Sequence, residues 1–86
     1  MPSRTVVVGS RVGLHARPAA LIAEAVARTG VAVTLGTPSG RSVDAASALM
    51  IMTLGAKQGT DVVVSCADQT VLERIAGMVA EDLDAQ

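Results

Sequence analysis

Short runs of β-branched and apolar residues mark four segments of the chain as candidate strands. Residues 5–8 are mostly β-branched and precede Gly9, and residues 61–66 carry three consecutive valines. Within residues 31–35, valine and leucine alternate with alanine and threonine. The Thr-Pro-Ser-Gly sequence that follows is typical of a turn, and residues 41–45 are expected to return from it. These patterns predict four strands, one of them with a clearly one-sided hydrophobic face.

Three other segments favour helices. One is expected to begin near Pro18 and to end at Gly30, because proline suits a first helical turn and glycine a C-terminal cap. Residues 47–54 contain leucine and methionine and end at Gly55, which also favours a helix. A last helix is expected near Thr70, where Thr70 and Glu73 could form a capping box. The predicted buried stripes are Ala19, Ile22, Ala23 and Val26 in the first helix, and Leu72, Ile75, Val79 and Leu83 in the last.

The order β-α-β-β-α-β-α predicts an α+β fold with one sheet and helices packed on one of its faces. At 86 residues the chain is too short for two ordinary domains. We therefore expect a single domain over residues 1–86. The element order alone leaves the order of the strands open.

Composition then excludes several classes of protein. Half of the residues are hydrophobic, yet Phe, Tyr and Trp are all absent. The chain therefore has no aromatic platform on which nucleic-acid bases could stack, and its net charge of −1 argues against a nucleic-acid partner. Cys66 is the only cysteine and His15 the only histidine, so neither a disulfide within the chain nor a metal site is expected. No cofactor is expected either.

The chain shows no sign of export or membrane insertion. The residues before the first predicted strand are too few for a signal peptide, and no apolar run approaches the roughly 20 residues that span a bilayer. A single cysteine suits a reducing compartment. We expect a cytoplasmic protein.

The sequence Gly13-Leu14-His15-Ala16-Arg17-Pro18-Ala19 carries the clearest chemistry. His15 is expected in a loop just before a helix, beside the free backbone N–H groups of Ala16 and Arg17 and the positive end of the helix dipole. Such a position binds phosphate well, and the Arg17 guanidinium could add a charge-assisted hydrogen bond to a phosphoryl oxygen. The spacing favours a histidine that accepts a phosphoryl group.

Other interpretations of His15 remain open from spacing alone. A single histidine at a helix start can be an ordinary surface residue or a helix cap. An α+β ligand-binding module with an incidental histidine would take no phosphoryl group, and a small histidine-dependent hydrolase would turn over substrate without a protein acceptor. No sequence signature of a hydrolytic triad is present.

Two blocks of sequence resemble a known family. The stretch from Gly13 to Ala19 resembles the active-site signature of HPr, the histidine phosphocarrier of the bacterial sugar phosphotransferase system. Ser47 and the sequence Thr53-Leu54-Gly55-Ala56-Lys57-Gln58-Gly59 resemble the regulatory-serine helix of that family and the loop after it. The spacing of the two blocks and the length of the chain also match.

The resemblance implies an open-faced sandwich, a four-stranded antiparallel sheet in the order 1-4-2-3 with three helices on one face. It implies that phospho-enzyme I phosphorylates His15 on Nδ1, that Arg17 stabilises the phosphoryl group, and that a IIA domain of a sugar permease then receives it. The protein would be a carrier between enzymes and not an enzyme itself. A related relay for nitrogen regulation or dihydroxyacetone kinase would share this chemistry and differ in partner.

The resemblance also implies that Ser47 is a regulatory phosphorylation site. The chain departs from the family at Ala46, where a basic residue commonly precedes that serine. The alternative role of Ser47 is to cap the short helix.

A docking surface is expected around His15. Leu21 lies outside the buried stripe of its helix, and Leu49 and Met52 share one face of the short helix. The resemblance places Ile51 and Leu54 inside, which leaves Ala48, Leu49, Met52 and Leu21 as an apolar patch for partner proteins on a monomer. The alternative is that these residues pack under a loop.

Overall fold

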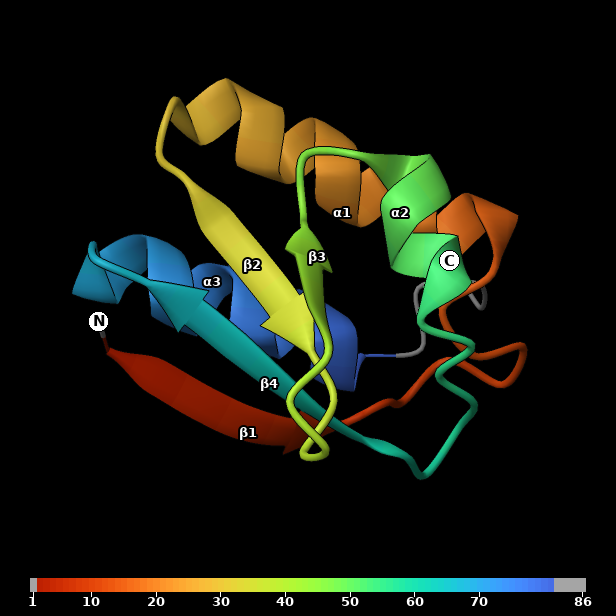
Figure 1. The fold of residues 1–86 in the computed structure, drawn as a ribbon. Coiled ribbons are helices and arrows are strands. Elements are labelled where there is room, and N and C mark those ends of the chain that lie inside the picture. The colour runs from red at the N-terminus through yellow and green to blue at the C-terminus, as the bar shows by residue number, and fades with distance from the viewer. Residues whose placement is uncertain (1, 82–86) are drawn as a thin grey trace.

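A computed structural model describes residues 2–81 and contains one four-stranded sheet (Figure 1). Its strands are β1 (Ser3–Val7), β2 (Val33–Gly36), β3 (Ser42–Asp44) and β4 (Asp61–Cys66). They lie in the order β1-β4-β2-β3, and every neighbouring pair is antiparallel. This is the expected strand order, and the predicted segments lie within a few residues of the observed strands.

The two faces of the sheet differ in burial because side chains alternate along a strand. On β4, Val62, Val64 and Cys66 are buried, whereas Asp61 is exposed and Val63 is half-buried. The register aligns the buried Val64 with Leu35 of β2, so the inner side chains of neighbouring strands form one apolar surface. The opposite face of the sheet is not covered by a helix (Figure 1).

Three helices cover the inner face: α1 (Ala16–Thr29), α2 (Ala48–Thr53) and α3 (Gln69–Ala80). The predicted stripe of α1 is buried in full, as are Leu72, Ile75 and Val79 of α3. Leu83, the fourth member of that stripe, lies outside the described residues. α2 contacts α1 and β3, which places it at the end of the helical layer (Figure 1).

α1 and α3 begin within two residues of their predicted starts, and only the predicted capping box is wrong. α1 begins at Ala16, two residues before Pro18, so proline occupies the third helical position, where its missing N–H costs no intrahelical bond. α3 is capped by Asp68, whose carboxylate accepts hydrogen bonds from the Thr70 and Val71 N–H groups. The Thr70–Glu73 capping box is therefore not formed, because the helix has already begun at Gln69.

The core between sheet and helices consists of aliphatic side chains, with Leu14, Ile22, Leu35, Ile51, Leu72 and Ile75 among its largest members. Among residues 2–81, none of the helices combines the length and the apolar character needed to cross a bilayer.

Candidate functional site

The loop from Val8 to His15 is held against a second loop, which joins α2 to β4. The Val8 N–H donates to the Thr60 carbonyl, and the Gly59 N–H donates to the Val8 carbonyl, both at 3.0 Å. Further along, the Leu14 N–H donates to the Ala56 carbonyl at 2.9 Å. Because these hydrogen bonds hold the first loop at both Val8 and Leu14, the two loops form one structural unit.

Gly13 is needed where the two loops touch. Its φ of +71° lies in the left-handed region, which favours glycine. A Cβ at this position would clash with the Ala56 carbonyl oxygen and would lie 2.9 Å from the Lys57 Cα. The next residue, Leu14, is 4% exposed and anchors the loop in the core. His15 therefore follows directly after a fixed point of the backbone.

The same loop also rests on the end of α3. The Gly9 N–H donates to the Val79 carbonyl at 3.1 Å, and a Cβ on Gly9 would overlap the Ala80 carbonyl. The Ser10 hydroxyl is buried and lies 3.5 Å from the Glu81 carbonyl. α3 thus supports the loop in addition to the 56–60 segment.

His15 is the N-cap residue of α1, and its backbone performs the capping. Its φ of −87° and ψ of −166° are extended, and its carbonyl accepts the Ala19 N–H at 2.9 Å. Its side chain makes no capping hydrogen bond and is exposed. The imidazole is consequently available to a partner while its backbone is fixed.

The first turn of α1 suits an anion. A helix supplies no carbonyl acceptor for the N–H groups of its first turn, and Ala16 and Arg17 contribute two such groups, whereas Pro18 contributes none. No acidic residue lies in that turn, so no carboxylate of the turn competes for the positive end of the dipole. These are the backbone positions that the sequence predicted for phosphate.

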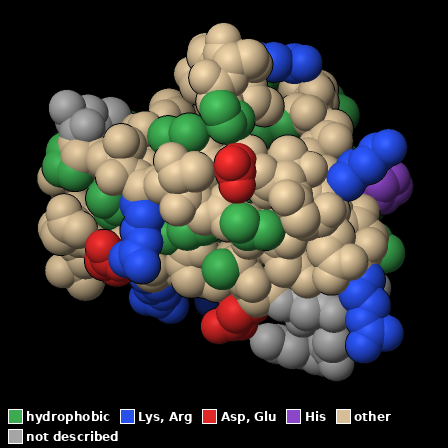
Figure 2. Space-filling model, turned by 90° about the horizontal axis from the view of Figure 1, so that it is seen from below, with side chains coloured by type: hydrophobic (Ala, Val, Ile, Leu, Met, Phe, Trp, Pro, Cys, Tyr) green, Lys and Arg blue, Asp and Glu red, His purple; other side chains and the backbone are tan. Residues whose placement is uncertain are grey.

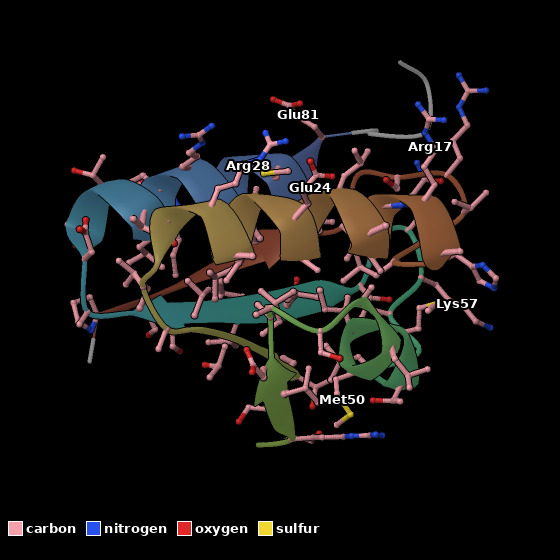
Figure 3. All side chains as sticks on the ribbon, turned by 90° about the horizontal axis from the view of Figure 1, so that it is seen from above. Arg17, Glu24, Arg28, Met50, Lys57 and Glu81 are labelled. Carbon is pink, nitrogen blue, oxygen red and sulfur yellow. The ribbon has the colours of Figure 1, made fainter. Side chains whose placement is uncertain are left out.

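Basic side chains gather at the same end of the molecule. Figure 2 shows the single histidine with a basic side chain beside it. Figure 3 shows Arg17 and Lys57 at the N-terminal end of α1, on opposite sides of the helix. The sequence predicted Arg17 as a site residue but gave no role to Lys57. Lys57 could have been considered because it belongs to the second motif, and the structure places that motif against Gly13.

The exposed apolar surface near this end differs from the predicted patch. Leu49 is 69% exposed, as expected, whereas Leu21, Ala48 and Met52 are half-buried and pack against the core. Leu21 is therefore more buried than predicted, because it was expected to face solvent. Met50, at 41% exposure, is exposed on α2 although the prediction did not include it. Ile51 is buried, as predicted, whereas Leu54 is only half-buried, like Met52.

Ser47 is the N-cap of α2. Its hydroxyl oxygen accepts a hydrogen bond from the Met50 N–H at 3.3 Å. The side chain is half-buried. The capping role proposed from the sequence is confirmed by this bond.

Three hollows elsewhere among residues 2–81 are small. They have volumes of about 220, 190 and 280 Å³, below the 300–1,000 Å³ typical of small-molecule sites, and His15 lines none of the three. Among residues 2–81, no group of three His, Cys, Asp or Glu side chains is placed to hold a metal ion.

Comparison with protein families identifies the chain. Residues 2–81 match the family model described as the PTS HPr component phosphorylation site. The chain belongs to the PTS HPr family. A phosphocarrier protein HPr of Streptomyces coelicolor is 42% identical over 87 residues, covering 98% of this chain and 94% of that protein. HPr proteins are phosphocarriers of the phosphotransferase system and are not catalysts.

Solved structures of similar proteins share this fold. A phosphocarrier protein HPr of Bacillus anthracis superposes with a TM-score of 0.83 at 28% identity, covering 91% of this chain and 95% of that one. The Bacillus subtilis catabolite repression protein Crh, a dimer with a swapped domain, gives 0.71 at 34% identity over 92% and 93% of the two chains. The HPr fold and the phosphocarrier role are thus supported by sequence and structure alike.

Proposed function

We propose that His15 accepts a phosphoryl group from phospho-enzyme I on Nδ1 and passes it to the IIA domain of a sugar permease. The observation that carries the proposal is the exposed imidazole of His15 at the start of α1, in a chain of the HPr family. The backbone caps the helix, so the ring has no capping bond to break before it reacts.

The transfer step needs a neutral imidazole nitrogen. The Nδ1 lone pair forms a bond to phosphorus, the bond between phosphorus and the donor breaks, and its electron pair leaves with the donor group. Negative charge on the phosphoryl oxygens is met by the backbone N–H groups of Ala16 and Arg17 and by the Arg17 guanidinium. Phosphoryl transfer depends mainly on such positioning and charge stabilisation. The reverse step, with a IIA domain as acceptor, uses the same groups.

The partners dock on the apolar surface of α2 and its neighbours, Leu21, Ala48, Leu49 and Met52, next to His15. Phosphorylation of Ser47 would regulate that docking. The protein acts as a monomeric cytoplasmic carrier formed by one domain over residues 1–86. Because Crh is a swapped dimer, the oligomeric state should be measured by sedimentation before rates are compared.

Labelling with phosphoenolpyruvate and enzyme I tests this function. Wild-type protein should take up one phosphoryl group as a phosphoramidate, which is labile in acid and stable in base. His15→Ala should take up none, and a purified IIA domain should remove the label from the wild type. Label retained by His15→Ala would refute the assignment. Label accepted only from the first enzyme of a nitrogen-regulatory or dihydroxyacetone-kinase relay would keep the carrier chemistry and change the partner.

A further inference from the structure

We propose that Lys57 provides a second cation for the phosphoryl group on His15. This inference rests on the proposed function, since it concerns the same histidine. It assigns a role in phosphoryl binding to the loop that joins α2 to β4, in addition to its structural contact with Gly13.

The backbone of Lys57 lies against the loop that carries His15. A Cβ built on Gly13 would be 2.9 Å from the Lys57 Cα, and the residue before Lys57 accepts the Leu14 N–H at 2.9 Å. Gly13 and His15 are two residues apart, so their Cα atoms are at most about 7 Å from each other. A lysine side chain extends roughly 6 Å from its Cα, a span comparable to this separation.

The position of the Lys57 backbone is fixed by a tight turn. The Lys57 N–H donates to the Thr60 hydroxyl at 3.2 Å, and the Thr60 N–H donates back to the Lys57 carbonyl at 3.0 Å. The Gln58 side-chain amide donates to the Gly9 carbonyl at 3.3 Å, which ties this turn to the His15 loop a second time. The stem of Lys57 therefore starts from a defined point.

The ammonium group is available for an anion. The Lys57 side chain is exposed, and no carboxylate among residues 2–81 forms an ion pair with it, whereas Arg4 pairs with Glu73 and Arg28 with Glu24. Figure 3 places Lys57 and Arg17 on opposite sides of the start of α1. His15 is the N-cap residue at that helix start, so a phosphoryl group on its ring would be within the field of both cations. Lysine acts here as a point charge, and Arg17 as a planar fork.

The test must separate a contact with the phosphoryl group from docking of a partner protein. Potassium phosphoramidate serves as the probe, because this small phosphoryl donor needs no protein surface. The imidazole nitrogen forms its bond to phosphorus as the P–N bond of the donor breaks, and the departing nitrogen takes up protons to leave as ammonia. Lys57→Gln should be phosphorylated about tenfold more slowly than wild type, and Lys57→Arg close to the wild-type rate. The difference should shrink at high salt.

Arg28→Gln is the matched control. It also removes one exposed cation, but from the far end of α1, roughly 16 Å along the axis from Arg17. Its rate should equal that of wild type. In a ³¹P NMR titration of the phosphorylated proteins, the midpoint for the phosphoryl group should be lower in wild type than in Lys57→Gln, because a nearby cation favours the dianion.

Several outcomes would overturn the proposal. Equal rates and equal ³¹P midpoints for wild type and Lys57→Gln would exclude a contact with the phosphoryl group. Slower transfer from enzyme I together with an unchanged rate from phosphoramidate would make Lys57 a docking residue instead. Failure of wild-type protein to accept any phosphoryl group would refute the carrier function itself, and is thereby distinguished from a failure at Lys57.

Discussion

At the scale of single residues, His15 separates two tasks that a capping residue usually combines. Ser47 and Asp68 cap their helices through side-chain oxygens, whereas His15 caps α1 through its backbone carbonyl alone. The arrangement costs α1 a side-chain cap, a contribution of about 1 kcal/mol in other helices. It leaves the imidazole accessible for chemistry.

Arg17 is expected to matter more for transfer than for stability. Arg17→Ala should slow phosphoryl uptake at His15 by about tenfold or more, because a charge-assisted hydrogen bond to the phosphoryl group is lost. The free energy of unfolding should change by less than about 1 kcal/mol, as for most exposed side chains. Arg17→Lys should restore only part of the rate, since lysine lacks the planar fork. Stopped-flow uptake and thermal melts measure the two effects, and an unchanged uptake rate would contradict the assignment.

Gly13 combines a left-handed backbone conformation with a close contact to the second loop, two residues before His15. Gly13→Ala should destabilise the protein by about 2 kcal/mol or more, since a left-handed conformation is combined with a clash against backbone atoms. Gly55→Ala is the matched control, because Gly55 also has a positive φ of +63° but no atom within 4 Å of an added Cβ. It should cost about 1 kcal/mol. Equal losses in chemical denaturation would show that the contact between the loops is not tight.

At the scale of elements, α2 illustrates how burial divides a short helix. Ile51 is buried, Met52 and Leu54 are half-buried, and Leu49 and Met50 are exposed. Six residues cannot form a stable helix alone, so packing against α1 and β3 holds α2 in place. The same packing determines which side of α2 remains for a partner.

Ser47→Asp should separate the stability of α2 from its function. Aspartate can keep the capping bond to Met50, and its charge is favoured by the helix dipole, so stability should stay equal or rise by roughly 0.3–1 kcal/mol. Binding to enzyme I should weaken severalfold, because the charge at the edge of the docking surface must lose water in the complex. Calorimetric melts and titrations with enzyme I measure both.

Ser47→Ala provides the control for that experiment. It removes the cap without adding charge, so it should lose about 1 kcal/mol of stability and bind enzyme I nearly as wild type does. If Ser47→Asp binds enzyme I as tightly as wild type, Ser47 lies outside the interface, and a regulatory role through docking should be abandoned.

At the scale of the whole molecule, the exposed apolar side chains occupy two different regions. Leu49 and Met50 lie on α2, and Val12 lies in the loop that leads to His15. Val7 is 52% exposed on β1, and the β1–β4 register places it on the uncovered face of the sheet. Only the first group is linked to the His15 loop through the contact of α2 with α1.

Chemical-shift mapping with enzyme I should therefore perturb Leu21, Leu49 and Met52 together with His15. Leu49→Ser should weaken binding by about tenfold, which corresponds to the loss of one buried leucine contact. Val7→Ser removes a similarly exposed apolar side chain from the other region and should leave binding unchanged. Perturbations confined to α3 would show that the docking surface is misplaced.

The local pattern of the chain determined most of its elements. The stripe from Ala19 to Val26 and the alternation along residues 31–35 are properties of neighbouring residues. The stripe is buried as predicted, and so are Val33 and Leu35 of the alternating segment. The His15 motif was also readable, because the histidine, the helix start and Arg17 lie within three residues. The predicted cap of α3 is wrong because Asp68 and Thr70 both fit a capping pattern, and Asp68 is the residue that caps the helix.

The sequence by itself thus determined the helices, the strands and the residue that carries the chemistry, since each depends on short-range periodicity or on a contiguous motif. Strand order entered only through the family resemblance. Tertiary structure decided how deeply Leu21 and Met52 are buried. The packing of α2 against α1 and β3 determines which side chains of these helices are covered. It also decided that Lys57 lies beside the Gly13–His15 loop, because this contact joins residues more than forty positions apart through the close approach of two backbones at Gly13.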